Sequence, residues 1–154
     1  MSRQVCEDMR LFLILILCST LLQSCDRTEP EIQSGESGER WYATAQITAG
    51  ASVFQQHCAL CHGERAQGLV GDWRQKLEDG SFPPPPLDGM AHAWHHPLSV
   101  LLQVINQGGA EFGGKMPSFA GVLSEDEKIA AIAYFQGYWS DEIYAQWLQM
   151  GGTN

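Results

Sequence analysis

Apolar residues recur at helical spacing in three separate stretches of the chain. In the first stretch, Ile47, Gly50, Phe54 and Cys58 follow one another at intervals of three, four and four residues. Such intervals place side chains on one face of an α-helix. The pattern therefore predicts a first helix that ends at Cys58.

The second stretch starts after Pro97 and stops before Gly108-Gly109. Proline near the start and glycine past the end are typical helix boundaries. The pattern predicts a middle helix whose apolar face consists of Leu98, Leu101, Leu102 and Ile105.

The third stretch opens with Ser124-Glu125-Asp126-Glu127, in which a serine precedes a glutamate by three residues. This spacing is the capping-box signature of a helix start. We expect the helix to pack on the first one, with Ile129, Ile132, Phe135 and Trp139 along one face. After Ser140, the pair Ile143 and Trp147 predicts a short extra C-terminal helix.

The segments 63–96 and 106–123 are rich in glycine and proline and contain no long alternation of apolar and polar residues. They are therefore predicted to be loops rather than strands. The expected fold class is all-α, with three core helices joined by long loops. A large apolar cofactor at the centre would make such a loop-rich chain foldable.

The N-terminal part of the chain carries export signals. Residues 11–22 form an apolar run of 12 residues, which is too short to cross a bilayer and typical of a signal-peptide core. We expect residues 1–24 to be a signal peptide. Because Glu7 and Asp8 are unusual in such a segment, translation is expected to start at Met9.

The run ends in Leu22-Gln23-Ser24-Cys25, which resembles a bacterial lipobox. We expect Cys25 to be acylated and to anchor the protein, while an ordinary cleaved signal is the alternative. Asp26 then resembles an inner-membrane retention signal. Residues 25–40 would be the attachment site and a flexible acidic linker, and residues 41–154 the folded domain.

The net charge of the chain is −9 at pH 7, and removal of residues 1–24 leaves it unchanged because the charges in that segment cancel. An acidic surface argues against nucleic acid as a partner. It favours a redox protein with a basic docking face in the periplasm or inner membrane.

The residues Cys58-Ala59-Leu60-Cys61-His62 form a CxxCH motif. Two thiols three positions apart reach both vinyl groups of one haem, and the adjacent imidazole then lies under the iron. The alternatives are a redox dithiol or a zinc site completed by other histidines. Cys6 and Cys18 fall in the signal peptide, so no disulfide is required.

Around this motif the chain resembles the bacterial class I cytochromes c, over residues 43–139. Gly50 and Phe54 lie eight and four residues before the first cysteine, and Ala133-Tyr134 lie in the last core helix, as in that family. The resemblance implies the class I cytochrome c fold around one covalently bound haem c.

The resemblance also implies the residues beside the haem. In Pro85-Pro86-Leu87-Asp88-Gly89, the Pro85 carbonyl would accept the Nδ1 proton of His62. The four consecutive prolines leave the register open, and a stiff surface turn is the alternative. Met116, followed by Pro117, would be the sixth iron ligand, with Met90 and Met150 as competitors.

The histidines His92, His95 and His96 fall within five residues of one another. Three imidazoles at this spacing would bind copper or supply an axial ligand. The alternative is a loop whose rings meet solvent or the haem propionates, because Pro97 breaks the helix that would align His92 with His96.

An iron with both axial positions filled has no site for substrate, and the chain carries no other catalytic motif. We therefore expect an exported one-electron carrier, periplasmic or tethered to the membrane, rather than an enzyme. Two alternatives remain: a haem- or copper-linked sensor or metal-handling protein, and a small cytochrome subunit of an oxidase or dehydrogenase complex.

Overall fold

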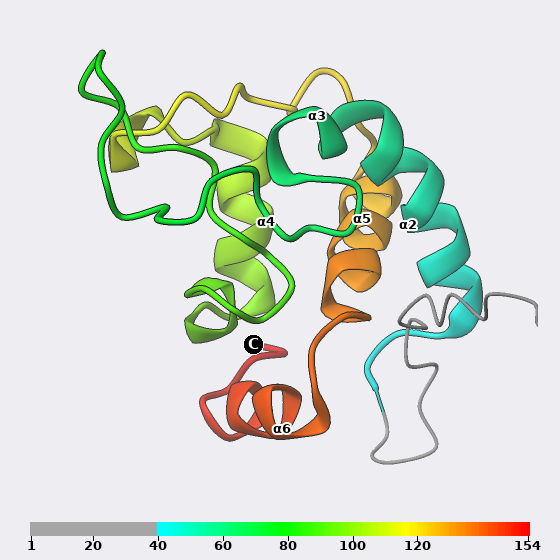
Figure 1. Ribbon diagram of the computed structural model, residues 1–154. Coiled ribbons are helices and arrows are strands. Elements are labelled where there is room, and N and C mark those ends of the chain that lie inside the picture. The colour runs from blue at the N-terminus through cyan, green and yellow to red at the C-terminus, as the bar shows by residue number, and fades with distance from the viewer. Residues whose placement is uncertain (1–39) are drawn as a thin grey trace, which may run out of the picture. The chain divides into compact units, whose positions relative to one another are not determined.

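The computed structural model describes residues 40–154. The predicted signal peptide, the Met9 start, the lipidation site Cys25 and the linker up to residue 39 lie outside the described residues. Within the described part every regular element is a helix and there is no strand (Figure 1). The all-α prediction is therefore confirmed for this part of the chain.

Helices α2 (Thr44–His57) and α5 (Glu125–Gln136) pack closely against each other. The buried residues of α2 are Ile47, Gly50 and Phe54, which belong to the predicted stripe. A Cβ added at Gly50 would lie 1.9 Å from the carbonyl oxygen of Ala130. Glycine at this position therefore lets the two backbones touch.

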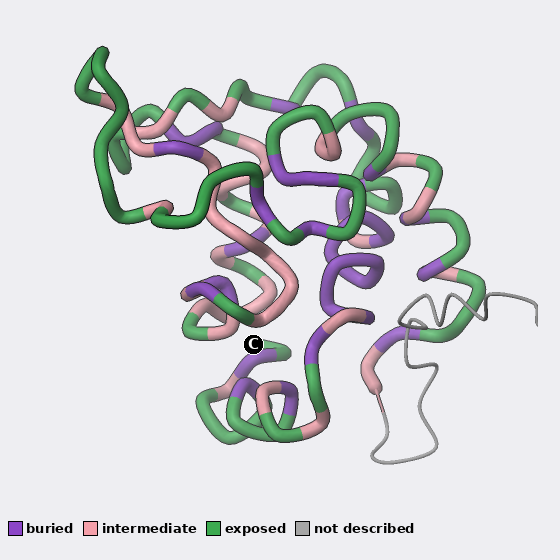
Figure 2. Tube along the Cα trace, viewed as in Figure 1, coloured by how far each residue is buried: buried purple, intermediate pink, exposed green. Residues whose placement is uncertain are grey.

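Helix α5 begins at the predicted capping box. The Ser124 hydroxyl accepts a hydrogen bond from the Glu127 amide at 3.3 Å, and the Glu127 carboxylate accepts one from the Ser124 amide at 2.8 Å. Every residue from 130 to 136 is buried (Figure 2). The helix ends at Gln136, so Trp139 lies beyond it, although its side chain is fully buried as expected.

Helix α4 (Leu98–Gln107) confirms the predicted middle helix. Leu101 is buried, and the three other residues of its apolar face are half-buried against the core. The helix ends at Gly108, where φ is +86°. This left-handed conformation explains why glycine follows the helix.

The extra C-terminal helix is present as α6 (Asp141–Gln149). The Ser140 hydroxyl caps it by accepting a hydrogen bond from the Ile143 amide at 3.3 Å. The residues that follow α6 in the sequence contact the start of α4, where the Leu98 amide donates a hydrogen bond to the Gly152 carbonyl at 2.7 Å. Three short elements interrupt the rest of the chain: α3 (Ala59–His62), η1 (Ala93–His95) and η2 (Ala110–Phe112).

The start of the described chain is fastened to the same end of the fold. The Arg40 guanidinium pairs with the Asp141 carboxylate at 2.8 Å and lies over the Tyr144 ring at 4.1 Å. The Trp41 indole donates to the Gln136 side-chain oxygen at 2.6 Å. None of the helices described in residues 40–154 has the length and apolar character that a membrane span requires.

The contact between α2 and α5 yields a stability prediction. Replacing Gly50 with alanine should lower the free energy of unfolding by about 1–3 kcal/mol, because the new methyl group overlaps the Ala130 carbonyl and forces the helices apart. Chemical denaturation of the haem-loaded protein measures this change.

Gly121→Ala is the matched control, since no atom lies within 4 Å of a Cβ at that position. It should change the free energy of unfolding by no more than about 0.5 kcal/mol. An equal change in the free energy of unfolding in the two variants would contradict the close contact between α2 and α5.

Candidate functional site

The CxxCH motif sits at the junction of two helices. Helix α2 ends just before Cys58, and α3 forms a single turn that ends at His62. Cys58 is half-buried and Cys61 exposed, and both are free thiols. The Leu60 side chain between them is 88% exposed. One turn of helix thus offers two thiols while directing the following imidazole inward.

The His62 ring is buried and its Nδ1 atom lies 2.9 Å from the Pro85 carbonyl oxygen. A carbonyl only accepts hydrogen bonds, so Nδ1 carries the proton and Nε2 keeps its lone pair. Burial lowers the pKa of His62, and the bond to Pro85 opposes this only in part. The neutral ring therefore presents Nε2 as a ligating atom with a fixed orientation.

Cys58 is in an environment that keeps its sulfur protonated. Burial raises the pKa of the Cys58 thiol to about 11, with a further contribution from the charge of Cys61. Disulfide exchange proceeds through the thiolate, which is scarce at neutral pH for such a group. This environment does not favour the redox-dithiol alternative.

The loop that follows His62 is held by both long helices. The Glu64 carbonyl accepts hydrogen bonds from the Tyr134 hydroxyl of α5 at 3.0 Å and from the Gln55 side chain of α2 at 2.8 Å. The Gly68 amide donates back to the His62 carbonyl at 2.7 Å. Tyr134, which the resemblance singled out, thus fixes the chain beside the motif.

The proline-rich segment is attached to this loop. The Leu87 amide donates to the Ala66 carbonyl at 2.7 Å, and a Cβ at Gly68 would lie 3.1 Å from the Pro86 ring. The structure brings His62 and Pro85 together in the register that the resemblance implies. The stiff surface turn, by contrast, would leave the Pro85 carbonyl facing solvent.

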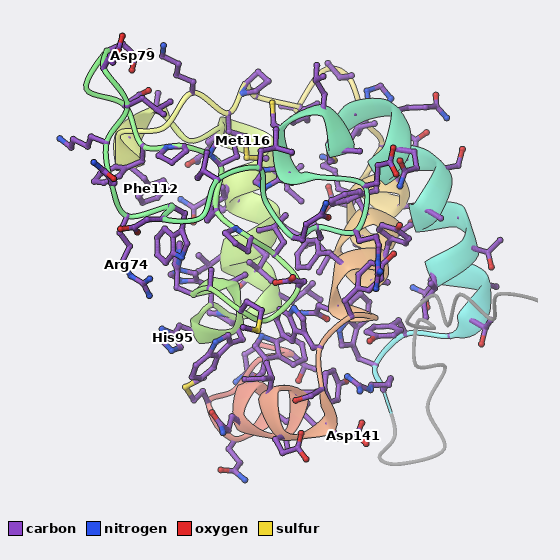
Figure 3. The ribbon with its side chains drawn as sticks, viewed as in Figure 1. Arg74, Asp79, His95, Phe112, Met116 and Asp141 are labelled. Carbon is purple, nitrogen blue, oxygen red and sulfur yellow. The ribbon has the colours of Figure 1, made fainter. Side chains whose placement is uncertain are left out.

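Met116 is fixed separately, at the C-terminal end of α4 (Figure 3). The Gly109 amide donates to the Met116 carbonyl at 2.9 Å, and a Cβ at Gly108 would lie 2.6 Å from the same oxygen. Met116 is half-buried, whereas the side chains of Met90 and Met150 are 82% and 51% exposed. Of the three methionines, Met116 is the least exposed.

A buried lysine that sequence reasoning missed supports the Met116 loop. Lys128 of α5 donates to the Asn106 side-chain oxygen at 2.6 Å and pairs with Glu125 at 3.0 Å. The Asn106 carbonyl in turn accepts a hydrogen bond from the Ser118 hydroxyl, two residues after Met116. In the sequence, the only indication of this role was the position of Lys128 directly before Ile129, the first residue of the predicted apolar face.

The three clustered histidines do not form a metal site. His92 stacks on Trp73 with ring centroids 4.8 Å apart, His96 meets the His92 ring edge-on at 5.4 Å, and His95 is exposed (Figure 3). Across residues 40–154, no three or more His, Cys, Asp or Glu side chains are arranged to hold a metal ion. The described residues therefore do not form the three-ligand copper or zinc site that the sequence left open.

The donor set fits a c-type haem. Two free thiols, a neutral imidazole with an oriented Nε2 and a half-buried thioether are the groups that such a cofactor uses. Apolar side chains that pack on the core while remaining only half-buried are available for contact with a porphyrin. Among them are Ala59, Leu87, Leu98, Leu102 and Ile105.

The comparisons with known proteins agree with this donor set. The family described as cytochrome c oxidase, cbb3-type, subunit III matches residues 45–135, from α2 to the last turn of α5. The cbb3-type cytochrome c oxidase subunit CcoP of Rhodobacter capsulatus is 33% identical over 75 residues. That stretch is 49% of this chain and 21% of the relative, so the chain spans about a fifth of the relative's length. No solved structure matches the chain significantly.

The support of the Met116 loop yields a second prediction. Lys128→Met keeps the bulk of the side chain but removes the charged donor to Asn106, and it should lower the free energy of unfolding by about 2 kcal/mol. Thermal or chemical unfolding measures the loss.

Lys115→Met provides the comparison, because the ion pair of Lys115 with Asp79 is exposed. Its loss should be no more than about 0.5 kcal/mol. A Lys128→Met variant as stable as Lys115→Met would show that the bond to Asn106 contributes nothing.

Proposed function

The chain belongs to the family of cytochrome c oxidase, cbb3-type, subunit III, and from this premise we propose that it is the single-haem electron-transfer subunit of an oxidase complex. The family is one of c-type cytochromes, which bind haem c covalently and transport electrons. The count of one haem rests on the single CxxCH motif in the chain. The observation that carries the subunit role is the match of residues 45–135 to this oxidase-subunit family, while the 2.9 Å contact between His62 Nδ1 and the Pro85 carbonyl supports the ligation of haem.

Each site residue has a defined part in this proposal. Cys58 and Cys61 would form the thioether bonds to the haem, and His62 and Met116 would ligate the iron. Pro85 orients His62 through its carbonyl oxygen. When bound, the haem supplies a one-electron Fe(III)/Fe(II) couple.

The ligand pair also determines what the protein does not do. Because a bound Met116 and a bound His62 leave the iron no open position, the protein passes electrons without binding oxygen or another substrate. The backbone contacts that hold the Met116 carbonyl at the end of α4 support the assignment of Met116 as this ligand. The reduction of the final acceptor would take place in another subunit of the complex.

The location proposed for the protein follows from its N-terminal sequence. We propose that residues 1–24 direct export, that Cys25 is acylated and that the haem domain lies on the periplasmic side of the inner membrane. The partners are then redox proteins of the membrane or periplasm. The net charge of −9 favours a basic docking face on them.

A second candidate is a carrier that moves between complexes instead of residing in one. The observation that favours it is the stretch 25–40, which places a predicted anchor and a linker before the domain. The local chemistry of the two candidates is the same. They differ in whether the protein stays bound to an oxidase.

Gentle detergent extraction of membranes followed by affinity capture of the tagged full-length chain distinguishes the candidates. A subunit should bring a terminal oxidase with it in fixed stoichiometry, with cytochrome-dependent oxygen uptake, and the association should survive moderate salt. Recovery of the haem protein alone, at low as well as moderate salt, would favour the mobile carrier.

The sixth ligand is tested by an optical redox titration of Met116→Ala. A thioether ligand raises the reduction potential, so its loss should lower the potential by on the order of 100 mV, within the range that axial ligands span. The reduced variant should also bind carbon monoxide, which the reduced wild type should not.

Met90→Ala and Met150→Ala are the matched controls, because both side chains are exposed. They should leave the spectrum and the potential unchanged. A Met116→Ala variant with the wild-type spectrum and potential would rule out Met116 as the ligand.

A further inference from the structure

Trp139 lies outside the stretch that the family matches, just beyond the end of α5. Its side chain is fully buried, and its indole Nε1 donates a hydrogen bond to the Leu87 carbonyl at 2.7 Å. An indole has one donor and no acceptor. The one hydrogen bond that the Trp139 side chain can donate therefore goes to a backbone oxygen 52 residues away in the sequence.

That oxygen belongs to the segment that holds His62. Leu87 is bonded on its other side to the Ala66 carbonyl, and Pro85, two residues earlier, accepts the His62 Nδ1 proton. Gly89 packs directly on the indole, since a Cβ there would lie 3.3 Å from Trp139 Cδ1. The segment is thus clamped between the loop after the CxxCH motif and the Trp139 ring.

The residue between the two carbonyls makes the clamp stiff. Pro86 links Pro85 to Leu87, and its ring locks φ, which removes one of the torsions that could absorb a displacement of the Leu87 carbonyl before it reaches the Pro85 carbonyl. The acceptor for His62 is a backbone atom, which no side-chain substitution at Pro85 removes. Its position therefore depends on the groups that hold the segment.

We propose that Trp139 is a positioning residue for His62. By fixing Leu87, it sets the hydrogen bond that His62 donates to Pro85 and thereby the basicity of Nε2 toward iron. The inference rests on the proposed function, in which His62 is an iron ligand. Because a more basic imidazole stabilises the oxidised iron, weakening the bond should raise the reduction potential.

Trp147 provides a close comparison within the same chain. It is also buried, and its Nε1 donates to a backbone carbonyl, that of His96, at 2.8 Å. The two indole rings touch, with centroids 5.9 Å apart. The carbonyl that Trp147 holds, however, lies before α4 and not in the segment that contacts His62.

The test compares Trp139→Phe with Trp147→Phe in the full-length, haem-loaded protein. Proton NMR of the reduced form follows the exchange of the His62 Nδ1 proton with solvent, and a redox titration gives the potential. In Trp139→Phe the proton should exchange about three- to tenfold faster, the factor expected from the loss of one net hydrogen bond, and the potential should rise.

In Trp147→Phe the stability should fall to a similar degree, while exchange and potential stay at the wild-type values. Equal changes in both variants, or none in Trp139→Phe, would overturn the inference. Should His62 protons lack the strong upfield shift of a haem ligand in the wild type, the proposed function itself would fail, which is a separate result.

A measurement on the wild type covers the case in which Trp139→Phe does not fold. Exchange of the Trp139 Nε1 proton and the His62 Nδ1 proton is followed at increasing denaturant. The two should report the same opening free energy and the same denaturant dependence, distinct from those of the Trp147 Nε1 proton. A His62 proton that opens independently of Trp139 would overturn the inference.

Discussion

The close approach of α2 and α5 at Gly50 and Ala130 is the constraint on which the site depends. Helix α2 runs directly into the turn that carries the two thiols and His62, and α5 supplies the side chains that hold the following loop. Separation of the two backbones by even one methyl group would move Cys58 relative to Tyr134. The packing of the two helices thus bears on the position of the donor atoms, which follow directly after the end of α2.

Both axial sides of the site are supported by α5 and the residues just beyond it. On the side of His62, the supports are Tyr134 and Trp139, which hold backbone carbonyls. On the side of Met116, the support is Lys128, which reaches the loop through Asn106. The two proposed iron ligands come from segments without long regular structure, and one buried helix supports both segments.

The sequence predicted the elements that local patterns encode and missed the contacts that join distant segments. Periodicity and capping identified α2, α4 and the start of α5, because these signals act over a few residues. The predicted apolar face of the last core helix extended to Trp139, although α5 ends at Gln136. Trp139 is buried without being helical, and an apolar pattern alone cannot distinguish the two. The resemblance named Pro85 as the carbonyl that meets His62, and the structure has this contact. The roles of Lys128 and Trp139, by contrast, depend on the tertiary fold and leave no trace in local spacing.

The acceptor for His62 is a main-chain oxygen, and this changes what kind of alteration the site tolerates. A substitution at Pro85 keeps a carbonyl at that point of the chain, so residue identity there is only indirectly constrained. Insertion or deletion of a single residue between Pro85 and Leu87 is different, because it shifts the Pro85 carbonyl relative to Leu87, whose amide and carbonyl are bonded to Ala66 and Trp139. The segment is therefore under a constraint of length and register more than of composition.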